Sequence, residues 1–473
     1  MQPGPRSPTA PVRALPVFPP RLEASCAQLV EHAQPGPRYT SYPPATRFAP
    51  DFDAGAAAAE LAALAAGPIG LYGHIPFCAQ LCWYCGCNVT ATRDRSRGAL
   101  YVDDLVRELG LVAATLGRRA AVSELALGGG SPNFLRAQDL ARLTEALHAH
   151  FAFEADAELG VELDPRDTSD GQIDELGRLG FTRVSVGVQD FDPEVQEAIH
   201  RIQTIEQTRR VVERARARGF RSVNADLVYG LPGQSVARLE RTLAAVIDFA
   251  PDRIAVFGYA HLPHLRPHQH LVERRLPVPG LPVRVELLRA VLDRLADAGY
   301  VRVGLDHFAR PGDPLVAAMA SGRLGRNFQG YVVERATALL GFGASAISDT
   351  GGAYWQNHVG LEEWTAAVRA DRLPVARGVA LTTDDRARRH VIMRLLCTGR
   401  CSLAELAVHL GVDAAASFGA ELDELERRHR DLAIVDRAAG TITATSLGHH
   451  LIRNVARVFD RHTAASAPGS PTI

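Results

Sequence analysis

The chain has no lysine, few cysteines and no long apolar run, and each absence excludes a class of function. All 52 basic residues among its 473 are arginine. A pyridoxal Schiff base and a phosphate-loop lysine both need an amine, so both chemistries are excluded. The apolar run 54–67 is too short to span a bilayer and contains Glu60. The net charge of −1 provides no overall attraction to nucleic acid or to an anionic membrane, so we expect neither as a partner.

The ends of the chain show no secretory signal. Residues 1–22 hold too many prolines for an apolar helical core, and we expect residues 1–36 to form a flexible arm. Residues 463–473 are predicted to be a disordered tail. We therefore expect a cytoplasmic protein whose seven cysteines stay reduced, which makes a disulfide the weakest explanation for any cysteine cluster.

Short apolar runs alternate with amphipathic stretches from residue 70 to about 260. Apolar residues three and four apart predict helices, for example over 101–117 and 235–250. Six strand–helix units in a row predict an α/β fold with a parallel barrel or partial barrel. The predicted strands cover 70–76, 124–130, 158–165, 183–189, 222–230 and 253–259.

Polar or glycine-rich residues follow five of these strands in succession. In barrels of this kind the active site lies at the carboxyl ends of the strands. A turn or a helix cap explains any one of these residues by itself, but five together predict an active edge. They are Cys78, the segment 128–132, Glu162 with Asp164, Gln189 with Asp190, and Asp226.

The pattern changes after residue 260. Four histidines in 261–270 suggest a metal site, but two prolines and no regular element favour a solvated loop. Helical patterns from about residue 380, followed by a hairpin over 432–445, predict a small winged-helix-like unit. Such units often bind DNA, yet this one has acidic residues before the hairpin and no basic stripe. A packing or lid role is the better interpretation.

Four cysteines lie within ten residues, directly after the first predicted strand. Cys78, Cys82 and Cys85 have the spacing Cys-x3-Cys-x2-Cys, and Cys87 follows two residues later. Zinc sites usually take four ligands from two separated pairs, and no second pair exists here. Cys397 and Cys401 are far along the chain and are predicted to be buried helical thiols. Three close thiolates suit a [4Fe–4S] cluster with one iron open to another ligand, although a structural zinc loop stays possible.

The cysteine spacing after a first barrel strand resembles the radical S-adenosylmethionine superfamily. Further motifs resemble one family within it, the oxygen-independent coproporphyrinogen III oxidases (coproporphyrinogen dehydrogenases). The resemblance covers roughly residues 37–462. The segments that carry it include YGHIPFCAQLCWYCGCN, GGGSPNFL, VELDPRD, GFTRVSVGVQDFDPEVQEAIHR, NADLVYGLPGQ, VFGYAHLP, RYTSYPPA and GRNFQGY.

The resemblance implies a domain order and a set of cofactor contacts. It implies a substrate-covering segment over 37–69, a radical catalytic partial (β/α)6 barrel with extensions over 70–350, and a C-terminal unit over 351–462. Cys78, Cys82 and Cys85 would bind the [4Fe–4S] cluster. One S-adenosylmethionine would contact the open iron with Tyr72, Gly129, Glu162 and Ile347. A second would contact Tyr84, Gly130, Ser131, Gln189, Arg201, Asp226 and Ala260.

The resemblance also implies a reaction and its partners. Coproporphyrinogen III would lose carbon dioxide from two propionates, giving two vinyl groups and protoporphyrinogen IX, and two S-adenosylmethionines would be consumed. Tyr72, Glu162 and Cys87, which is not a cluster ligand, would lie at the reacting centre. Arg38 and Arg326 suit the substrate carboxylates. A flavodoxin or ferredoxin would supply electrons to a monomeric enzyme.

The sequence departs from the family pattern at three positions, and three rival functions fit part of it. Ser131 and Asn133 stand where threonines are expected, and Tyr84 stands where phenylalanine is common; Ser131 keeps the hydroxyl and Tyr84 keeps the ring. A heme chaperone of the same superfamily shares the cysteine spacing but generally lacks the RYTSYP and RNFQGY segments, both of which are present here. A heme-degrading radical methyltransferase and a zinc-stapled winged-helix DNA-binding protein are the second and third rivals.

Overall fold

A twelve-stranded sheet forms the centre of the computed structural model, which describes residues 18–462 and 470–471. Seven neighbouring strands in the sheet run parallel. In sheet order these strands are β14 (Leu339–Phe342), β2 (Ile69–Ile75), β5 (Ala121–Gly129), β6 (Ala152–Leu163), β7 (Arg183–Gln189), β8 (Ser222–Tyr229) and β9 (Arg253–Gly258). The six predicted strands are therefore confirmed, with shifts of up to six residues at their ends.

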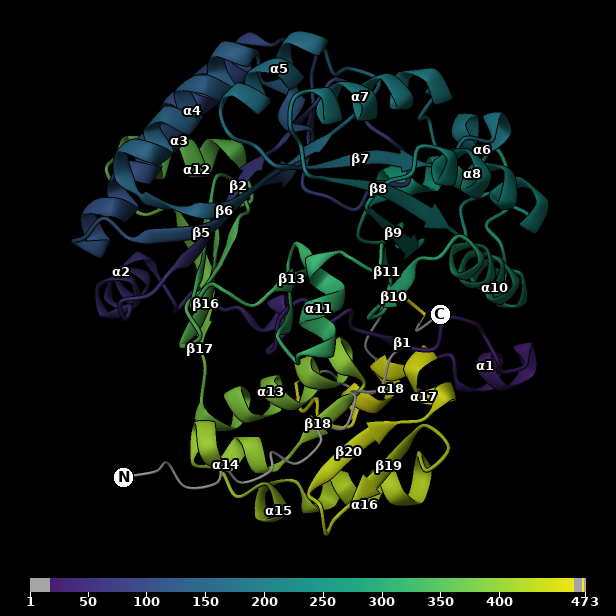
Figure 1. Cartoon of the computed structure of the whole chain (residues 1–473). Coiled ribbons are helices and arrows are strands. Elements are labelled where there is room, and N and C mark those ends of the chain that lie inside the picture. Colours follow the sequence, from purple (N-terminus) through teal and green to yellow (C-terminus); the bar gives the residue numbers. More distant parts are fainter. Residues whose placement is uncertain (1–17, 463–469, 472–473) are drawn as a thin grey trace, which may run out of the picture.

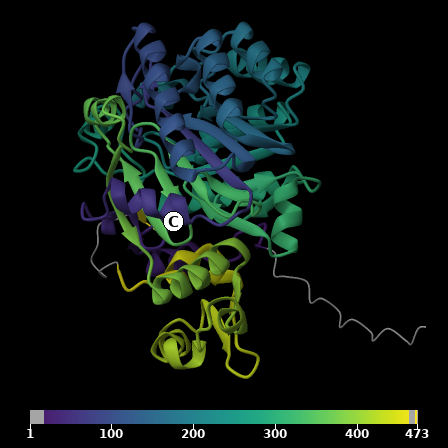
Figure 2. The ribbon, with the colours of Figure 1, turned by 90° about the vertical axis from the view of Figure 1, so that its left-hand side faces the viewer.

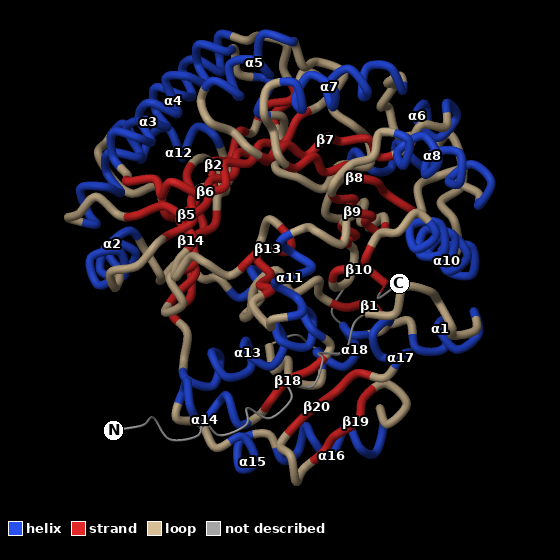
Figure 3. Tube along the Cα trace, viewed as in Figure 1, coloured by secondary structure: helices blue, strands red, loops and turns tan. Residues whose placement is uncertain are grey.

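Helices connect the parallel strands and cover the outer face of the curved sheet (Figure 1). They are α3 (Ser96–Leu116), α4 (Ala137–His150), α5 (Asp170–Arg178), α6 (Pro193–Ala198), α7 (Ile205–Ala217), α8 (Val236–Asp248) and, after β9, α10 (Leu281–Asp297). Coloured by element type, the strands lie inside this layer of helices (Figure 3). The α/β partial barrel predicted from the alternation is confirmed.

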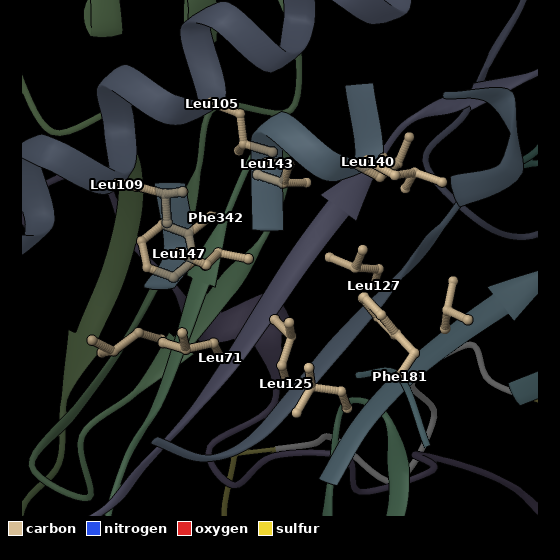
Figure 4. Packing of buried hydrophobic residues seen from close by; sticks show 14 of the residues in the cluster. Leu71, Leu105, Leu109, Leu125, Leu127, Leu140, Leu143, Leu147, Phe181 and Phe342 are labelled. Carbon is tan, nitrogen blue, oxygen red and sulfur yellow. The ribbon is translucent and has the colours of Figure 1, made fainter. Parts of the chain in front are cut away.

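Apolar side chains at helical spacing explain why these helices pack where they do. Leu105 and Leu109 of α3 are buried against the sheet, as are Leu140, Leu143 and Leu147 of α4. They meet alternate side chains of the strands beneath them, among them Leu71, Leu125 and Leu127 (Figure 4). Burial of each such leucine contributes roughly 1.5–3 kcal/mol. This packing leaves the opposite, concave face of the sheet to polar side chains.

Both ends of the parallel sheet continue as antiparallel strands. Beyond β9 lie β11 (His307–Ala309) and β10 (Val301–Val303), and beyond β14 lie β15 (Ile347–Asp349), β16 (Ala353–Asn357) and β17 (Val375–Ala380). The domain boundary expected at 350/351 falls within this extension. Because β16 and β17 are hydrogen-bonded into the large sheet, the sheet runs on to residue 380.

The C-terminal unit begins with α13 (Thr383–Thr398) and projects from one side of the molecule (Figure 2). A three-stranded sheet accompanies its helices, in the order β18-β20-β19, which agrees with the predicted winged-helix-like unit. Cys397 is buried on α13 as expected, but the prediction of a helical thiol is wrong for Cys401, which is buried on strand β18. The elements after α13 are β18 (Arg400–Ser402), α14 (Ala404–Leu410), α15 (Ala414–Ser417), α16 (Gly419–Arg428), β19 (Ala433–Asp436), β20 (Thr441–Ala444), α17 (Ser446–His450) and α18 (Ile452–Arg457).

The N-terminal segment lies between the barrel and the C-terminal unit. Helix α1 (Cys26–His32) packs on α10, and its Leu29 is fully buried. The Tyr39 hydroxyl donates a hydrogen bond to Asp460, 3.0 Å away. The expectation of a flexible arm over 1–36 is therefore wrong for residues 26–32, which form helix α1 and bury Leu29. Residues 1–17 of that arm, and 463–469 with 472–473 of the expected tail, lie outside the described residues.

Shorter elements complete the described chain, and none of its helices is long and apolar enough to cross a bilayer. Those elements are β1 (Pro35–Gly36), η1 (Ala45–Arg47), α2 (Ala54–Ala63), β3 (Phe77–Cys78), β4 (Thr90–Ala91), η2 (Pro132–Phe134), η3 (Pro267–Gln269), α9 (His270–Glu273), α11 (Pro314–Ala320), β12 (Leu324–Asn327), β13 (Gly330–Val333), α12 (Leu361–Arg369) and β21 (Ser470–Pro471).

Candidate active site

The cysteine loop, residues 78–87, lies at the carboxyl end of β2 and is held by backbone hydrogen bonds to two other segments. Ser131 donates its backbone N–H to the Phe77 carbonyl, 2.8 Å away, where the loop begins. Within the loop, Trp83 donates its backbone N–H to the Ile199 carbonyl at 2.9 Å, and its ring stacks on His200. A backbone held at both points keeps the thiols in place before any ligand binds.

The segment 261–270, which we expected to be a solvated loop, instead braces the cysteine loop. His268 bonds the Cys85 carbonyl at 2.7 Å, Arg266 donates to the Gly86 carbonyl at 3.0 Å, and Gln269 donates to the Tyr84 carbonyl at 2.9 Å. The expectation is therefore wrong for these side chains. Backbone carbonyls, exposed in the loop, attract donors that sequence spacing alone does not reveal.

Two guanidinium groups flank the buried thiol of Cys82. The Nη2 nitrogen of Arg166 lies 3.4 Å from the Cys82 sulfur, and the Nη1 nitrogen of Arg201 lies 3.5 Å from it. Both arginines also bind Asp164, at 2.6 Å and 3.1 Å. Burial raises the pKa of Asp164, but the two guanidinium charges outweigh it and lower this pKa to about 2. The site thus surrounds one thiol with fixed positive charge.

The other loop thiols differ in their electrostatic surroundings. Burial raises the pKa of Cys78 to about 12, and its sulfur lies 3.8 Å from the Ser131 hydroxyl. The Cys87 thiol and backbone N–H both hydrogen-bond the Cys85 sulfur, which lowers the pKa of Cys85 to about 7 against the effect of burial. The same bond raises the pKa of Cys87. Of this pair, Cys85 is therefore the thiolate and Cys87 the proton donor.

Two carboxyl groups face the same space from β6 and β8, the strands on either side of β7. Burial among protein atoms, followed by the Asp226 charge, raises the pKa of Glu162 to about 7. Burial also raises the pKa of Asp226, although it accepts hydrogen bonds from Ser185 and Asn224. Like-charged carboxylates that share one cavity cannot both ionise freely. A bound cation or hydroxyl donor would relieve this repulsion.

The glycines at the end of β5 leave room beside these carboxyl groups. A Cβ on Gly128 would lie 2.8 Å from the Glu162 carboxyl carbon. A Cβ on Gly129 would lie 2.4 Å from the His74 ring, and Gly129 has a φ of +107°. A side chain at Gly129 would therefore be strained, and one at Gly128 would displace the Glu162 carboxyl group. With no side chains at these positions, the backbone is open to close approach by a ligand.

A cavity of about 480 Å³ brings most of the predicted site residues together. All four loop cysteines line it, and so do the residues expected to contact S-adenosylmethionine, except Tyr72 and Ile347. The Tyr72 hydroxyl bonds His74 at 3.1 Å, and burial followed by the Glu162 charge raises its pKa, so Tyr72 lies just behind the wall. Ile347, the first residue of β15, packs beside Phe48 and Tyr354.

Sequence reasoning missed several polar residues of this wall. Arg166 lies within the VELDPRD segment, yet its contact with Cys82 was not predicted. Asn224 and Ser185 also line the cavity. Asn224 lies two residues before Asp226 on the same strand, so the period-2 alternation of side chains could have found it. Ser185 could be placed beside Asp226 only with knowledge of the register between β7 and β8, which the tertiary structure provides.

Comparison with known proteins agrees with this geometry. A model of the radical SAM superfamily matches residues 72–246. An oxygen-independent coproporphyrinogen III oxidase of Pseudomonas aeruginosa is 42% identical over 438 residues, which cover 90% of this chain and 93% of the relative. An Escherichia coli relative of the same name is 38% identical, covering 94% and 97%. This chain belongs to the oxygen-independent coproporphyrinogen III oxidase family.

A solved structure extends the match to the fold. It is described as coproporphyrinogen III oxidase from Escherichia coli, a radical SAM enzyme, and superposes with a TM-score of 0.86 at 40% identity. It covers 90% of this chain and 98% of its own. As a radical SAM oxidoreductase of this family, the enzyme takes a [4Fe–4S] cluster and S-adenosylmethionine as cofactors.

The residues of the oxidase fit these cofactors. Three thiols of one fixed loop supply the donor set of a cluster in which each cysteine binds a different iron. Among the described residues, no three His, Cys, Asp or Glu side chains converge as the ligands of a single metal ion do. Buried nitrogens of Arg166 (Nη1) and Arg201 (Nε) at the cavity wall have no hydrogen-bond partner within the described part of the chain. These nitrogens suit an anionic group such as the carboxylate of S-adenosylmethionine.

Proposed function

We propose that this oxidase converts two propionate side chains of coproporphyrinogen III into vinyl groups, giving protoporphyrinogen IX in porphyrin synthesis. Each decarboxylation would consume one S-adenosylmethionine. The observation that carries this proposal is the single cavity in which the cysteine loop, the Arg201–Asp164 pair and the Glu162–Asp226 pair meet. The names of full-length relatives support the choice of substrate.

Cys78, Cys82 and Cys85 would hold the cluster. When bound, the reduced cluster and S-adenosylmethionine together supply an acceptor for a hydrogen atom at the propionate β-carbon. Arg166 and Arg201 would lie beside the bound cluster, because each has a guanidinium nitrogen within 3.5 Å of the Cys82 sulfur. Cys85 loses its proton most easily of the loop pair, which favours ligand binding at neutral pH.

The remaining residues would orient the cofactor and the substrate. Glu162 and Asp226 would accept hydrogen bonds from ribose hydroxyls or from the ammonium group of S-adenosylmethionine, which would offset the repulsion between the two carboxyl groups. Ser131 and the backbone N–H groups of 129–130 offer donors at the end of β5. Gln189 holds a φ of +66°, a strained conformation that directs the chain at the end of β7 toward the cavity. Cys87, protonated beside Cys85, faces the cavity and would contact cofactor or substrate.

The partners and surroundings of the enzyme form part of the same proposal. We infer a cytoplasmic monomer that receives electrons from a small reductant such as a flavodoxin or a ferredoxin. A cavity lined by strand ends, with Arg38 of the N-terminal segment in its wall, suits a buried reaction, because exclusion of water protects reactive species.

Anaerobic purification followed by turnover tests the proposal. Protein reconstituted with iron and sulfide should show cluster absorption, and with dithionite and coproporphyrinogen III it should form 5′-deoxyadenosine and protoporphyrinogen IX. The Cys85→Ser variant should lose the cluster absorption and the two products. Cys26→Ser, which changes a half-buried thiol on α1, should keep the absorption and the products. Hemin binding without turnover would instead indicate a heme chaperone and contradict the proposed function.

A further inference from the structure

A second cavity of about 60 Å³ adjoins the active-site cavity and is lined by five arginines. The two cavities share Arg38 and Gly258 in their walls. The second cavity lies where β8, β9 and α10 meet the N-terminal segment and helices α17 and α18. Its arginines are Arg38, Arg284, Arg302, Arg326 and Arg453.

Arg38 and Arg302 donate hydrogen bonds to neutral acceptors. Arg38 donates to the Gly258 carbonyl. Arg302 donates to the His450 ring at 2.9 Å. A carbonyl or a neutral imidazole satisfies an N–H group but cannot cancel a positive charge.

One carboxylate, Asp306, shares the described wall of this cavity with the five arginines. It lies 3.6 Å from Arg326 and also accepts a 2.7 Å bond from His307. The Arg326 charge and the His307 bond outweigh burial and lower the pKa of Asp306. His450 is neutral and cancels none of the arginines' charge, since burial and then the Arg302 charge lower its pKa to about 2. The described wall therefore carries an excess of positive charge.

Burying a guanidinium group whose N–H groups are not all hydrogen-bonded is unfavourable. Arg302 and the side chain of Arg326 are each only 4% exposed, and the Nε atom of each has no hydrogen-bond partner within the described residues. Burial lowers the pKa of Arg302 and of Arg453 to about 10, and the Arg38 charge contributes to the shift at Arg453. A structure that keeps such a cluster has organised donors for an anion.

We propose that this five-arginine cavity binds a carboxylate of the tetrapyrrole substrate, from a propionate other than the one being decarboxylated. The inference rests on the proposed function and adds a specificity site to it. At about 60 Å³ the five-arginine cavity is much smaller than the active-site cavity of about 480 Å³, so we assign the macrocycle to the larger cavity. The guanidinium fork matches a planar carboxylate in two parallel hydrogen bonds. Anchoring a remote carboxylate would hold the reacting propionate at the cofactors.

Binding of coproporphyrin III, the oxidised and unreactive form of the substrate, tests the site without turnover. Arg302→Met and Arg38→Gln should each weaken its binding at least tenfold, measured by porphyrin fluorescence titration of the reconstituted enzyme. Coproporphyrin III tetramethyl ester should bind the wild type weakly, and the two substitutions should not weaken it further. Arg388→Gln is the matched control, because Arg388 is a buried arginine on α13 paired with Asp384 and Glu421.

Stability without ligand separates binding from a structural role. Arg302→Met removes a buried charge that makes no ion pair with a carboxylate among the described residues, so the urea midpoint should stay level or rise. Arg388→Gln breaks a paired arginine and should lower the midpoint while leaving coproporphyrin III affinity unchanged. A fallen midpoint with wild-type affinity in both Arg302→Met and Arg38→Gln would assign these arginines to structure and overturn the inference.

Two further outcomes distinguish this inference from the proposed function. If the wild type produces protoporphyrinogen IX and both variants keep the wild-type KM, only the inference fails. If the wild type produces no protoporphyrinogen IX, the proposed function is wrong, whatever the two variants show. Inorganic phosphate that stabilises the wild type without competing against coproporphyrin III would assign the cavity to a free anion and would also overturn the inference.

Discussion

Replacing Arg201 with glutamine should separate its contribution to folding from its contribution to cofactor binding. The Arg201 side chain is 7% exposed and contacts three groups: Asp164 at 3.1 Å, the Cys82 sulfur at 3.5 Å and the Gly187 carbonyl at 2.6 Å. Breaking a buried ion pair by removing one partner costs about 3–5 kcal/mol. Asp164 and Cys82 both keep Arg166 as a partner, at 2.6 Å and 3.4 Å. We therefore expect a loss of about 3 kcal/mol in the free energy of unfolding, at the lower end of that range.

The same substitution should weaken the cofactor site. Hydrogen bonds to charged groups are worth about 1.5–3 kcal/mol, so the affinity for S-adenosylmethionine should fall about 10- to 150-fold. Urea unfolding measures the first effect, and equilibrium dialysis of the reconstituted enzyme measures the second. Arg388→Gln, at a buried and carboxylate-paired arginine outside the cavity, should lose stability but bind S-adenosylmethionine normally. Equal S-adenosylmethionine affinity in Arg201→Gln and the wild type would refute the reasoning.

Three further substitutions probe the site and the core. Cys87→Ser should keep the iron and sulfide content of the wild type, whereas Cys85→Ser should lose it; equal loss in both would make Cys87 a ligand. Burial raises the pKa of Glu108 to about 7 from 4.5, so its protonated form stabilises the fold and about 3 kcal/mol is lost as the pH rises from about 4.5 to about 7. Glu108→Gln should remove this slope from urea midpoints measured across that range, and an unchanged slope would contradict the assignment. Gly129→Ala should cost about 2 kcal/mol or more, because its Cβ would meet His74 at a φ of +107°; a wild-type urea midpoint would disprove this strain.

The order of strands and helices was predictable because local patterns encode it. The β7 run 183–189 matches the observed strand in full, and the α8 pattern over 235–250 lies within two residues of Val236–Asp248 at each end. Continuous apolar runs identify strands that are buried on both faces, and apolar residues three and four apart identify helices that bury one face. The cysteine spacing likewise predicted a cluster loop, since Cys78, Cys82 and Cys85 lie in one short segment.

Contacts between distant segments could not be predicted in this way. Arg166 and Arg201 come from different β/α units, and only the packing of those units brings both guanidinium groups to Cys82. His268 lies 183 residues from Cys85, yet it bonds the Cys85 carbonyl. Side-chain spacing within a segment carries no information about such pairs, because their geometry depends on strand register and loop packing.

The sequence by itself therefore determined the alternating α/β architecture, the cysteine loop and the polar residues at the strand ends, since each depends on neighbours close in the chain. The tertiary structure alone decided which charges meet. Asp164 is paired with two arginines, whereas Arg38 and Arg302 come together with three others around a single carboxylate of the described cavity wall. Electrostatic energy depends on distance in space and on burial, and neither quantity can be read from positions along the chain.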